Sequence, residues 1–564
     1  MQLIRRAVPD TAGTLIAAGI PPVLARVYAA RGVSSPADLA LELTGLPSWR
    51  ALKGIDAAAD RLAQSITRNE KLLIVADYDA DGATACAVGV LGLRALGARV
   101  EFLVPNRFEY GYGLTPEIVA LAAERLPALI ITVDNGIASV EGVAAARARG
   151  IEVLITDHHL PGADLPATAL IVNPNQPGCA FPSRHLAGVG VMFYVLLALR
   201  ARLREQGRFA AGTQPNLAGL LDLVALGTVA DVVTLDHVNR ILVDQGLRRI
   251  RAGRMRPGMR ALFAVAGRDP AWASAYDLAF VVGPRLNAAG RLADMSIGIG
   301  CLLAPDEAAA APLAAELERL NRERREVEAT MQSEALDGLD AAVTDEQYTV
   351  CVYRPEWHQG VIGVVASRLK DRFHRPTIVF ARASDGELRG SGRSIPGFHL
   401  RDALDLVAKR ASGVIRRFGG HAFAAGLTLD ERSLPLFASE FECVARERLS
   451  PSALRHAVET DGELAPDELT LALAREIGAK VWGQGFPAPL FEGDFAVLEQ
   501  RIIGGKHMRL VLSGPGARLQ GVVFDDPGPI PERIRATYRP EVNRFQELES
   551  LQLVIDSWRS DTSP

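Results

Sequence analysis

The strongest constraint on the fold is an alternation of apolar runs and helical stretches between residues 71 and 155. The apolar runs are KLLIVA, ARVEFLV, ALIITV and EVLIT, and helical patterns separate them near residues 83–97, 115–126 and 137–149. Each run is continuous rather than alternating, which indicates a strand that is buried on both faces. Such strands joined by helical crossovers predict an α/β domain built on a doubly wound parallel sheet.

Length and composition limit what surrounds this sheet. The chain has 564 residues, and at roughly 150 residues per domain this length predicts three or four folded units. Hydrophobic residues make up 48% and charged residues 23%, which is ordinary globular usage and excludes a largely disordered chain. Asp222 and Asp231 interrupt the longest apolar stretch, so we expect no membrane-spanning helix.

The N-terminal residues and the cysteines predict a cytoplasmic protein. No apolar run with a small-residue cleavage site follows Arg5 and Arg6, so the start does not have the pattern of a secretory signal. The five cysteines are odd in number and never form a CxxC pair, which is typical of a reducing compartment.

The remaining chain shows three further patterns. Apolar spacing predicts one long, half-exposed helix near residues 306–340, and a second α/β pattern with the strands QYTVCVY and PTIVFA follows it. The tail contains five strand-like runs joined by Gly/Pro turns, which predicts a small Greek-key barrel of the oligonucleotide-binding (OB) type. We therefore expect a helical lead-in (1–55), a first α/β domain (56–300), a connector helix (301–342), a second, smaller α/β domain (343–448) and an OB-like domain (449–564).

Three polar clusters directly follow strands of the first predicted sheet. They are Asp77-Tyr-Asp79-Ala-Asp81-Gly after KLLIVA, Asp134-Asn-Gly after ALIITV, and Asp157-His158-His159 after EVLIT. Open α/β sheets bind ligands outside the carboxyl ends of their strands, so we expect the three clusters to meet. An EF-hand calcium loop is excluded for the first cluster, because its twelfth position would be Val88 instead of a bidentate Glu.

A fourth carboxylate belongs to the run DLVALGTVADVV, where Asp222 and Asp231 are both candidates and the sequence alone decides for neither. Two carboxylates of the first cluster, one each from the second and fourth, and an imidazole suit a pair of Mn²⁺ or Mg²⁺ ions better than zinc. Two such ions about 4 Å apart stabilise the attacking and leaving oxygens of a phosphoryl displacement. The residues therefore predict phosphoester hydrolysis.

The second α/β domain carries a local excess of positive charge. Between residues 388 and 429 there are seven basic and two acidic residues, whereas the whole chain has a net charge of −4. This excess suits a phosphate backbone, although a solvated basic face is the alternative. Gly390, Gly392, Gly419 and Gly420 favour the first interpretation, because glycine lets a backbone approach a phosphate closely.

These motifs resemble a known family. DYDADGATA, VDNG, TDHH and DLVALGTVAD resemble the four motifs of the DHH phosphoesterase superfamily, and FGGHAFAAG resembles the GGH motif of its associated second domain, DHHA1. WHQGVIGVVASRL, GPRLNAAGR, SGRS and the barrel-like tail extend the resemblance over nearly the whole chain, to the single-stranded-DNA-specific exonucleases of that superfamily.

The resemblance implies a metal-dependent exonuclease that acts on single-stranded DNA in recombination and repair. It implies two-metal hydrolysis that releases 5′-mononucleotides in the 5′→3′ direction. Asp77 and His159 would act in catalysis, with Asp77 as a metal ligand or a partner of one, and His159 would contact the scissile phosphate. The metal ligands would be Asp79, Asp81, Asp134, His158 and Asp222. The family expectation further includes a monomer in the cytoplasm, with a RecQ-type helicase and single-strand-binding protein as partners.

Other residues are candidates for contacts with the strand. Arg107, after ARVEFLV, is expected to bind the terminal 5′-phosphate together with Ser391 and Arg393, because arginine offers a bidentate fork. By resemblance, Gly419, Gly420 and His421 would contact a phosphate, and Arg285 and Asn287 would contact the backbone. Phe108, Tyr110 and Tyr112 could stack on bases or simply pack beside the sheet.

Three alternative functions account for less of the sequence. A nanoRNase or cyclic-dinucleotide phosphodiesterase resembles only the first two domains and leaves the connector and the barrel without a role. An inorganic pyrophosphatase begins its first motif with His, where this chain has Asp77. A non-catalytic DNA-binding scaffold is the alternative from another class, and the intact Asp157-His158-His159 argues against it.

Overall fold

The computed structural model describes residues 2–210, 212–342, 344, 346–383, 386–514, 517–545 and 548–560. Among these, the side chains of residues 107, 108, 338, 340–342 and 517 are left undescribed. The chain divides into two compact units. The smaller comprises Met1–Ile4 and Arg319–Val458, and the larger comprises Arg5–Glu318 and Glu459–Pro564.

The larger unit contains a five-stranded, all-parallel sheet in the order β3-β2-β4-β5-β6. Its strands are β2 (Lys71–Ala76), β3 (Arg99–Leu103), β4 (Leu129–Val133), β5 (Glu152–Thr156) and β6 (Leu170–Val172). Four of them coincide with the apolar runs, whereas β6 is too short for the pattern to identify. The strand order reverses between β2 and β4, and such a switch point is where open α/β sheets bind ligands.

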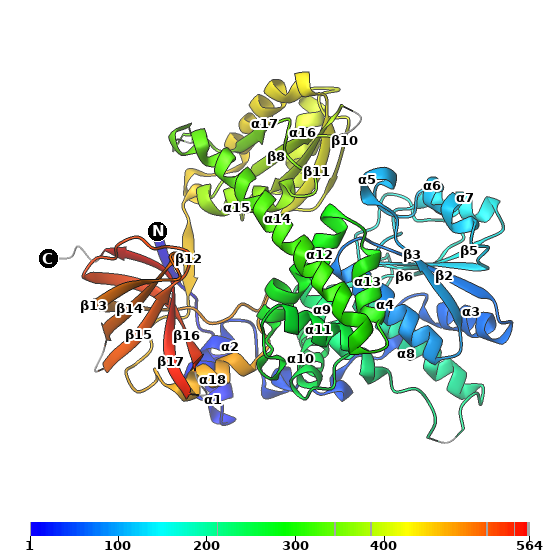
Figure 1. The fold of residues 1–564 in the computed structure, drawn as a ribbon, viewed down its shortest axis with the longest axis horizontal. Coiled ribbons are helices and arrows are strands. Elements are labelled where there is room, and N and C mark those ends of the chain that lie inside the picture. Colours follow the sequence, from blue (N-terminus) through cyan, green and yellow to red (C-terminus); the bar gives the residue numbers. More distant parts are fainter. Residues whose placement is uncertain are drawn as a thin grey trace. The chain divides into compact units, whose positions relative to one another are not determined.

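Helices cover both faces of this sheet, which confirms the doubly wound architecture. In Figure 1, α6 (Pro116–Ala123) and α7 (Val140–Ala148) lie on one side, and α3 (Ile55–Thr67) and α8 (Gly188–Glu205) lie on the other. The short α5 (Arg107–Tyr110) follows β3, and α4 (Ala80–Ala95) follows β2. Nearly every residue of α4 is buried, because the helix packs between the sheet and further helices.

Those further helices extend the first domain beyond the sheet. They are α9 (Leu221–Ala230), α10 (His237–Arg251), α11 (Pro257–Val265), a π-helical segment (Asp277–Val282), α12 (Gly283–Leu292) and α13 (Ser296–Leu303). Of these, α9, α12 and α13 contact α4, so α4 is enclosed by helices as well as by the sheet. None of the described helices is both long and apolar enough to cross a membrane.

The tail of the larger unit is a closed barrel in the order β13-β14-β15-β17-β16. Its strands are β13 (Phe491–Ile503), β14 (His507–Gly514), β15 (Ala517–Val523), β16 (Arg533–Phe545) and β17 (Leu548–Ser560). Only β15 and β17 pair in parallel, and β13 closes the barrel against β16. The predicted five-stranded, OB-like barrel is thereby confirmed.

The lead-in helices and the helix before the barrel lie in the same unit, whereas the residues of the short two-stranded sheet named below are divided between the two units. The helices are α1 (Thr11–Ala17), α2 (Pro22–Ala29) and α18 (Leu471–Ala479), and the strands β1 (Gln2–Arg5) and β12 (Ala457–Thr460) form a two-stranded sheet. Tyr28 of α2 stacks on Trp482 with ring centroids 5.8 Å apart, and Arg31 forms a buried ion pair of 2.7 Å with Asp461. The chain's beginning is therefore packed against the region that precedes the barrel.

The smaller unit is a second α/β domain with a mixed sheet in the order β10-β11-β9-β8-β7. Its strands are β7 (Val350–Tyr353), β8 (Thr377–Arg382), β9 (Leu388–Arg393), β10 (Arg417–Gly420) and β11 (Ala424–Leu429), and its helices are α15 (Ile362–Phe373), α16 (Leu400–Arg410) and α17 (Leu434–Arg448). SGRS and FGGHAFAAG fall on β9 and on the β10–β11 hairpin. Their glycines lower strand propensity, so the pattern did not predict these strands.

One long helix, α14 (Glu307–Ala342), confirms the predicted connector. The boundary between the two units falls within it, between Glu318 and Arg319. In the part of α14 that belongs to the larger unit, Ala310, Ala314 and Leu317 are buried, which explains the apolar spacing on one side of the helix.

Candidate metal centre

The first acidic cluster forms the turn from β2 into α4. The Asp77 N–H continues the sheet by donating to the Val133 carbonyl, and Asp79 caps α4 by accepting a 3.0 Å hydrogen bond from the Gly82 N–H. Only glycine fits at position 82, because a Cβ there would lie 2.6 Å from the Asp77 carbonyl oxygen. The local sequence thus places three carboxylates at the carboxyl end of a central strand.

Asp81 is buried in the first turn of α4, where the N-terminus of α8 holds its carboxylate. Its two oxygens accept hydrogen bonds of 2.6 and 2.9 Å from the N–H groups of Gly188 and Val189. A helix N-terminus favours negative charge. Burial, with a contribution from the neighbouring Asp79 carboxylate, nevertheless raises the pKa of Asp81 to about 7.

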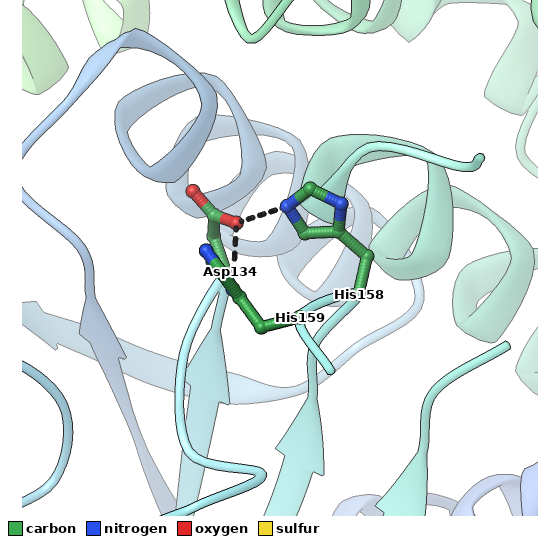
Figure 2. Close-up of side chains that lie close together, drawn as sticks. All are labelled: Asp134, His158 and His159. Atoms are coloured by element: carbon green, nitrogen blue, oxygen red, sulfur yellow. Dashed lines mark ion pairs between the residues drawn. The ribbon is translucent and has the colours of Figure 1, made fainter. Parts of the chain in front are cut away.

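Asp134 follows β4 and faces both histidines of the third cluster. Its Oδ1 lies 3.0 Å from Nε2 of His158 and 3.9 Å from Nδ1 of His159, and the dashed lines in Figure 2 mark these two ion pairs. The backbone of Asp134 is left-handed, with φ of 62°, a conformation that non-glycine residues adopt mostly at special sites. Gly188 leaves room for it, because a Cβ at that position would lie 2.6 Å from the Asp134 Cβ.

Asp157, the first residue of the third cluster, orients the two histidines. It is buried and accepts hydrogen bonds from the N–H groups of Ile137 (2.9 Å) and His158 (2.7 Å), and its Oδ1 lies 2.8 Å from Nδ1 of His159. Sequence reasoning assigned no role to Asp157. A carboxylate directly between a buried strand and two histidines was the signal that could have identified it.

The pair of Asp157 and His159 is charged. Burial opposes ionisation of both groups, but the hydrogen bond and the attraction between them keep the pKa of Asp157 below its ordinary value. The same interaction raises the pKa of His159 to about 9 against the effect of burial. His159 is therefore an imidazolium at neutral pH.

The fourth carboxylate of the cluster is Asp231, and the expectation for Asp222 is corrected. Asp231 ends α9, and its Oδ2 lies 3.5 Å from Nε2 of His158. Asp222 lies at the other end of α9, about 13 Å away at a helical rise of about 1.5 Å per residue. Its two oxygens accept hydrogen bonds from the N–H groups of Leu223 and Arg256, so this carboxylate is satisfied within the protein.

The clustered side chains fit divalent cations. Three groups have ligand atoms within 4.8 Å of one another among the described residues: Asp134/His158/His159, Asp81/His158/Asp231 and Asp77/Asp79/Asp134. Asp134 Oδ1 is buried and accepts no hydrogen bond from any described residue. Burial and the neighbouring carboxylates raise the pKa values of Asp134 and Asp231 well above the ordinary range. Bound cations would stabilise the ionised carboxylates and so lower these pKa values.

Tyr112 is the aromatic residue nearest these ligands among those singled out from the sequence. Half exposed, it places its hydroxyl 3.2 Å from the ring nitrogens of His159, and it donates to the Asp134 carbonyl at 3.3 Å. Tyr110 packs on the hydrophobic core beside the sheet instead. The side chains of Arg107 and Phe108 lie outside the described part of the structure.

Arg285 and Asn287, predicted to contact a DNA backbone, make contacts inside the protein. Arg285 is buried and its Nε lies 2.7 Å from a Glu318 carboxylate oxygen. Asn287 Oδ1 accepts a 2.8 Å hydrogen bond from the Ala80 N–H, between Asp79 and Asp81. Asn287 therefore supports the turn that presents the acidic cluster, and Arg285 anchors α12 to α14.

The smaller unit brings Ser391 and Arg393 together at the start of α15. Arg393 donates to Ser391 Oγ at 3.3 Å, and a Cβ on Gly363, in the first turn of α15, would lie 2.9 Å from that Oγ and 3.0 Å from Arg393 Nη2. Burial lowers the pKa of the guanidinium, and no described acidic side chain forms an ion pair with it. A cation, a hydroxyl and a helix N-terminus in one place suit a phosphate.

The glycines of the GGH motif continue this surface. Gly419 pairs with Gly426, and Gly426 pairs with Ser391, so the three lie side by side on one face of the sheet. Position 420 requires glycine, because φ is 139° there and a Cβ would lie 2.4 Å from the Ala424 carbonyl oxygen. His421 is exposed at the hairpin turn and donates its N–H to Ala424.

Three family models match the chain. The DHH family N-terminal domain matches residues 71–228, the DHHA1 domain matches residues 345–447, and the RecJ OB domain matches residues 460–557.

Curated relatives match almost end to end. The chain is 51% identical to the single-stranded-DNA-specific exonuclease RecJ of Dickeya dadantii, with 98% of each chain covered. It is 49% identical to the protein of the same name from Escherichia coli, with 99% of each covered.

Solved structures of RecJ proteins are also similar to this chain. The crystal structure of RecJ in complex with Mn²⁺ from Thermus thermophilus superposes with a TM-score of 0.84 at 30% identity, covering 100% of this chain and 80% of that one. A structure of exonuclease RecJ bound to manganese is 35% identical with a TM-score of 0.60, covering 73% of this chain and 97% of that one.

Proposed function

Because the chain belongs to the RecJ family of single-stranded-DNA-specific exonucleases, we propose that it degrades single-stranded DNA from the 5′ end and releases 5′-mononucleotides. The observation that carries this proposal is the convergence of five aspartates and two histidines at the switch point of the parallel sheet. The function is that of a nuclease in DNA recombination and repair.

The cofactors are divalent cations, Mn²⁺ or Mg²⁺, as in the related structures that contain them. We propose Asp77, Asp79 and Asp134 as ligands of one ion and Asp81, His158 and Asp231 as ligands of the other, with Asp134 near both. When bound, the cations supply Lewis-acid stabilisation of the attacking and leaving oxygens.

The chain's own residues position the phosphate and neutralise its charge. The raised pKa of His159 favours its imidazolium form, and its Nδ1 lies 2.8 Å from Asp157. We propose that this ring contacts the scissile phosphate or protonates the leaving oxygen, beside the Tyr112 hydroxyl that lies 3.2 Å from its Nε2. Asp157 is a positioning residue, because it acts through His159. Tyr112 offers a half-exposed ring beside the scissile nucleotide.

A terminal phosphate would be recognised in the smaller unit. Ser391, Arg393 and the first turn of α15 form the proposed phosphate site, and the exposed Gly419, Gly420 and His421 of the β10–β11 hairpin are proposed to contact the next part of the backbone. Arg107 remains a predicted phosphate contact from its place after β3. Recognition of a terminal phosphate would explain digestion from one end.

Cellular context remains a family expectation. We propose a monomer in the cytoplasm that works with a RecQ-type helicase and single-strand-binding protein, which generate and cover its substrate. The predicted domain boundaries (1–55, 56–300, 301–342, 343–448 and 449–564) also stay predictions. The match to the RecJ OB domain argues against the small-substrate branch, and the complete metal cluster argues against a non-catalytic scaffold.

The test uses a long single strand labelled at one end or the other and incubated with Mn²⁺ or Mg²⁺. We expect loss of only the 5′ label, as a mononucleotide, and no loss with Asp134→Ala. An intact strand beside a hydrolysed dinucleotide competitor would move the protein to the small-substrate branch.

A further inference from the structure

Three large aromatic side chains are exposed within a short segment of the larger unit. Trp272, Tyr276 and Phe280 are spaced four residues apart and are 55%, 60% and 61% exposed. The rings of Tyr276 and Phe280 lie side by side, with centroids 4.9 Å apart. Grouped exposed aromatics mark binding surfaces rather than packing. We name these three residues the aromatic track.

The helix that begins with Tyr276 and Phe280 continues to residues that pack beside the acidic cluster. Phe280 precedes Gly283 by three residues, about 4.5 Å of helix, and a Cβ on Gly283 would lie 3.1 Å from the Cβ of Ala230, the residue before Asp231. Further along the same helix, Asn287 holds the Ala80 N–H in the acidic turn. A strand that leaves the metal ligands along this helix meets Phe280 first.

The other end of the track reaches the barrel. The Arg544 guanidinium of β16 lies over the Trp272 ring at 3.8 Å from its centroid. Phe545 and Leu548, which flank the tip of the β16–β17 hairpin, are 67% and 74% exposed. Exposed apolar side chains therefore continue from the metal domain onto the barrel within one unit.

Charge around the track favours a polyanion. Residues 248–291 contain nine arginines and two acidic residues, Asp269 and Asp277. Four of the arginines (Arg248, Arg260, Arg268 and Arg285) form ion pairs with carboxylates, so the excess of positive charge is smaller than the count of arginines. Arg251 donates a 2.7 Å hydrogen bond to the Ala273 carbonyl, which joins this arginine-rich segment to the track. Exposed rings beside positive charge are the combination with which proteins bind single-stranded nucleic acid without sequence preference.

We propose that the aromatic track stacks the bases of the strand downstream of the scissile nucleotide and leads it from the metal centre to the β16–β17 hairpin. Stacking accepts every base, so the strand can advance as nucleotides leave. The inference rests on the proposed function and deepens it by assigning a second binding surface for the same substrate. Its role is retention of long strands, not hydrolysis.

The test compares Tyr276→Ala/Phe280→Ala with the unchanged chain. Anisotropy of a labelled long oligothymidylate, measured with chelator so that nothing is cut, should show binding weakened by at least about fivefold. With Mn²⁺ present, the rate on an oligothymidylate of two or three nucleotides should stay within about twofold, because so short a strand reaches at most the Phe280 end of the track. Trp272→Phe keeps a stacking ring and should bind as the unchanged chain does, whereas Trp272→Ala should not.

Leu126→Ala is the matched control. Leu126 is 83% exposed and precedes β4, whereas Asp134 follows the other end of that strand, so the loss of the Leu126 side chain should change neither binding nor rate. Unchanged binding of the long strand by the double variant would overturn the inference and leave the exonuclease in place, with the surface then free for a protein partner. An equal loss on short and long strands would also overturn it. If the unchanged chain binds the long strand but releases no nucleotide with Mn²⁺, that result would instead contradict the proposed exonuclease function.

Discussion

At the residue scale, the composition of the candidate metal centre depends on which carboxylates lie close to His158 and His159. Sequence spacing left Asp222 and Asp231 equivalent, because both interrupt the same apolar run. The structure separates them by the length of α9: Asp231 lies beside His158, and Asp222 accepts two backbone hydrogen bonds elsewhere. Two aspartates of the same short motif therefore have different surroundings: Asp231 belongs to the acidic cluster, whereas Asp222 accepts backbone hydrogen bonds at the other end of α9.

The two aspartates should respond differently to the same change. Asp231→Asn removes a negative ligand and should lower nucleotide release at least about tenfold. Asp222→Asn should keep the rate and lower the free energy of unfolding by about 1–3 kcal/mol, because a charged acceptor of two buried N–H groups is lost. Measuring rate and urea unfolding for both variants checks this, and an inactive but stable Asp222→Asn would restore Asp222 as a ligand.

A second residue-scale prediction concerns the charge of His159. Its pKa is raised to about 9, so the imidazolium is present below that pH and is lost as the pH rises through it. The rate should fall on the alkaline side near this value. Asp157→Asn removes the main stabiliser of the imidazolium and should move this limb to lower pH. Tyr110→Phe, whose ring packs on the hydrophobic core beside the sheet, serves as the control. An unmoved limb in Asp157→Asn would contradict the assignment.

At the element scale, close packing of α12 against the acidic turn positions the ligands. A Cβ on Gly290 of α12 would lie 1.9 Å from the Tyr78 carbonyl oxygen, and one on Gly227 of α9 would lie 2.9 Å from Asp81 Oδ1. Glycines in GPRLNAAGR and DLVALGTVAD thus let two helices approach the turn. The glycines of these motifs therefore support the turn that carries the acidic cluster.

Gly290→Ala tests this packing. Because its Cβ meets backbone, the turn must move, and we expect a loss of about 1–3 kcal/mol in the free energy of unfolding together with weaker Mn²⁺ binding. Gly478→Ala in α18 is the matched control: its Cβ meets nothing within 4 Å, so the helix should gain up to about 1 kcal/mol. Calorimetry with and without Mn²⁺ measures both, and an unaffected Gly290→Ala would show that the turn does not depend on α12.

At the scale of the whole molecule, burial of like charges links folding to the cations. Asp81, Asp134 and Asp231 all have pKa values raised by burial and by one another. Without cations, the folded chain must keep these groups protonated or bear their repulsion. The acidic cluster therefore lowers stability unless a positive charge compensates for it.

Metal removal should thus destabilise the protein in a pH-dependent way. A carboxyl group whose folded pKa is raised contributes stability below its unfolded pKa, and this contribution is lost as the pH rises through the folded value, here about 7 for Asp81. In chelator, the Tm should fall as the pH rises from about 4 to about 8, and Mn²⁺ should restore it most at the upper end. Thermal scans with and without Mn²⁺ measure this, and a Mn²⁺ effect that does not grow with pH would contradict it.

The sequence by itself determined the elements and their chemistry. Continuous apolar runs identified four strands of the parallel sheet, apolar spacing identified α14, and five strand-like runs identified the barrel, because these patterns are local. Asp77, Asp79, Asp81, Asp134 and His158 followed from their position after those strands.

Only the tertiary structure decided the rest, because it depends on contacts between distant segments. The direction of α9 selected Asp231, the hydrogen bond that Ala80 donates to Asn287 gave GPRLNAAGR an internal role, and the buried Asp157 fixed His159. The aromatic track became visible only when Trp272, Tyr276 and Phe280 proved exposed. A sequence states which side chains are available, whereas packing decides which of them meet and which of them face solvent.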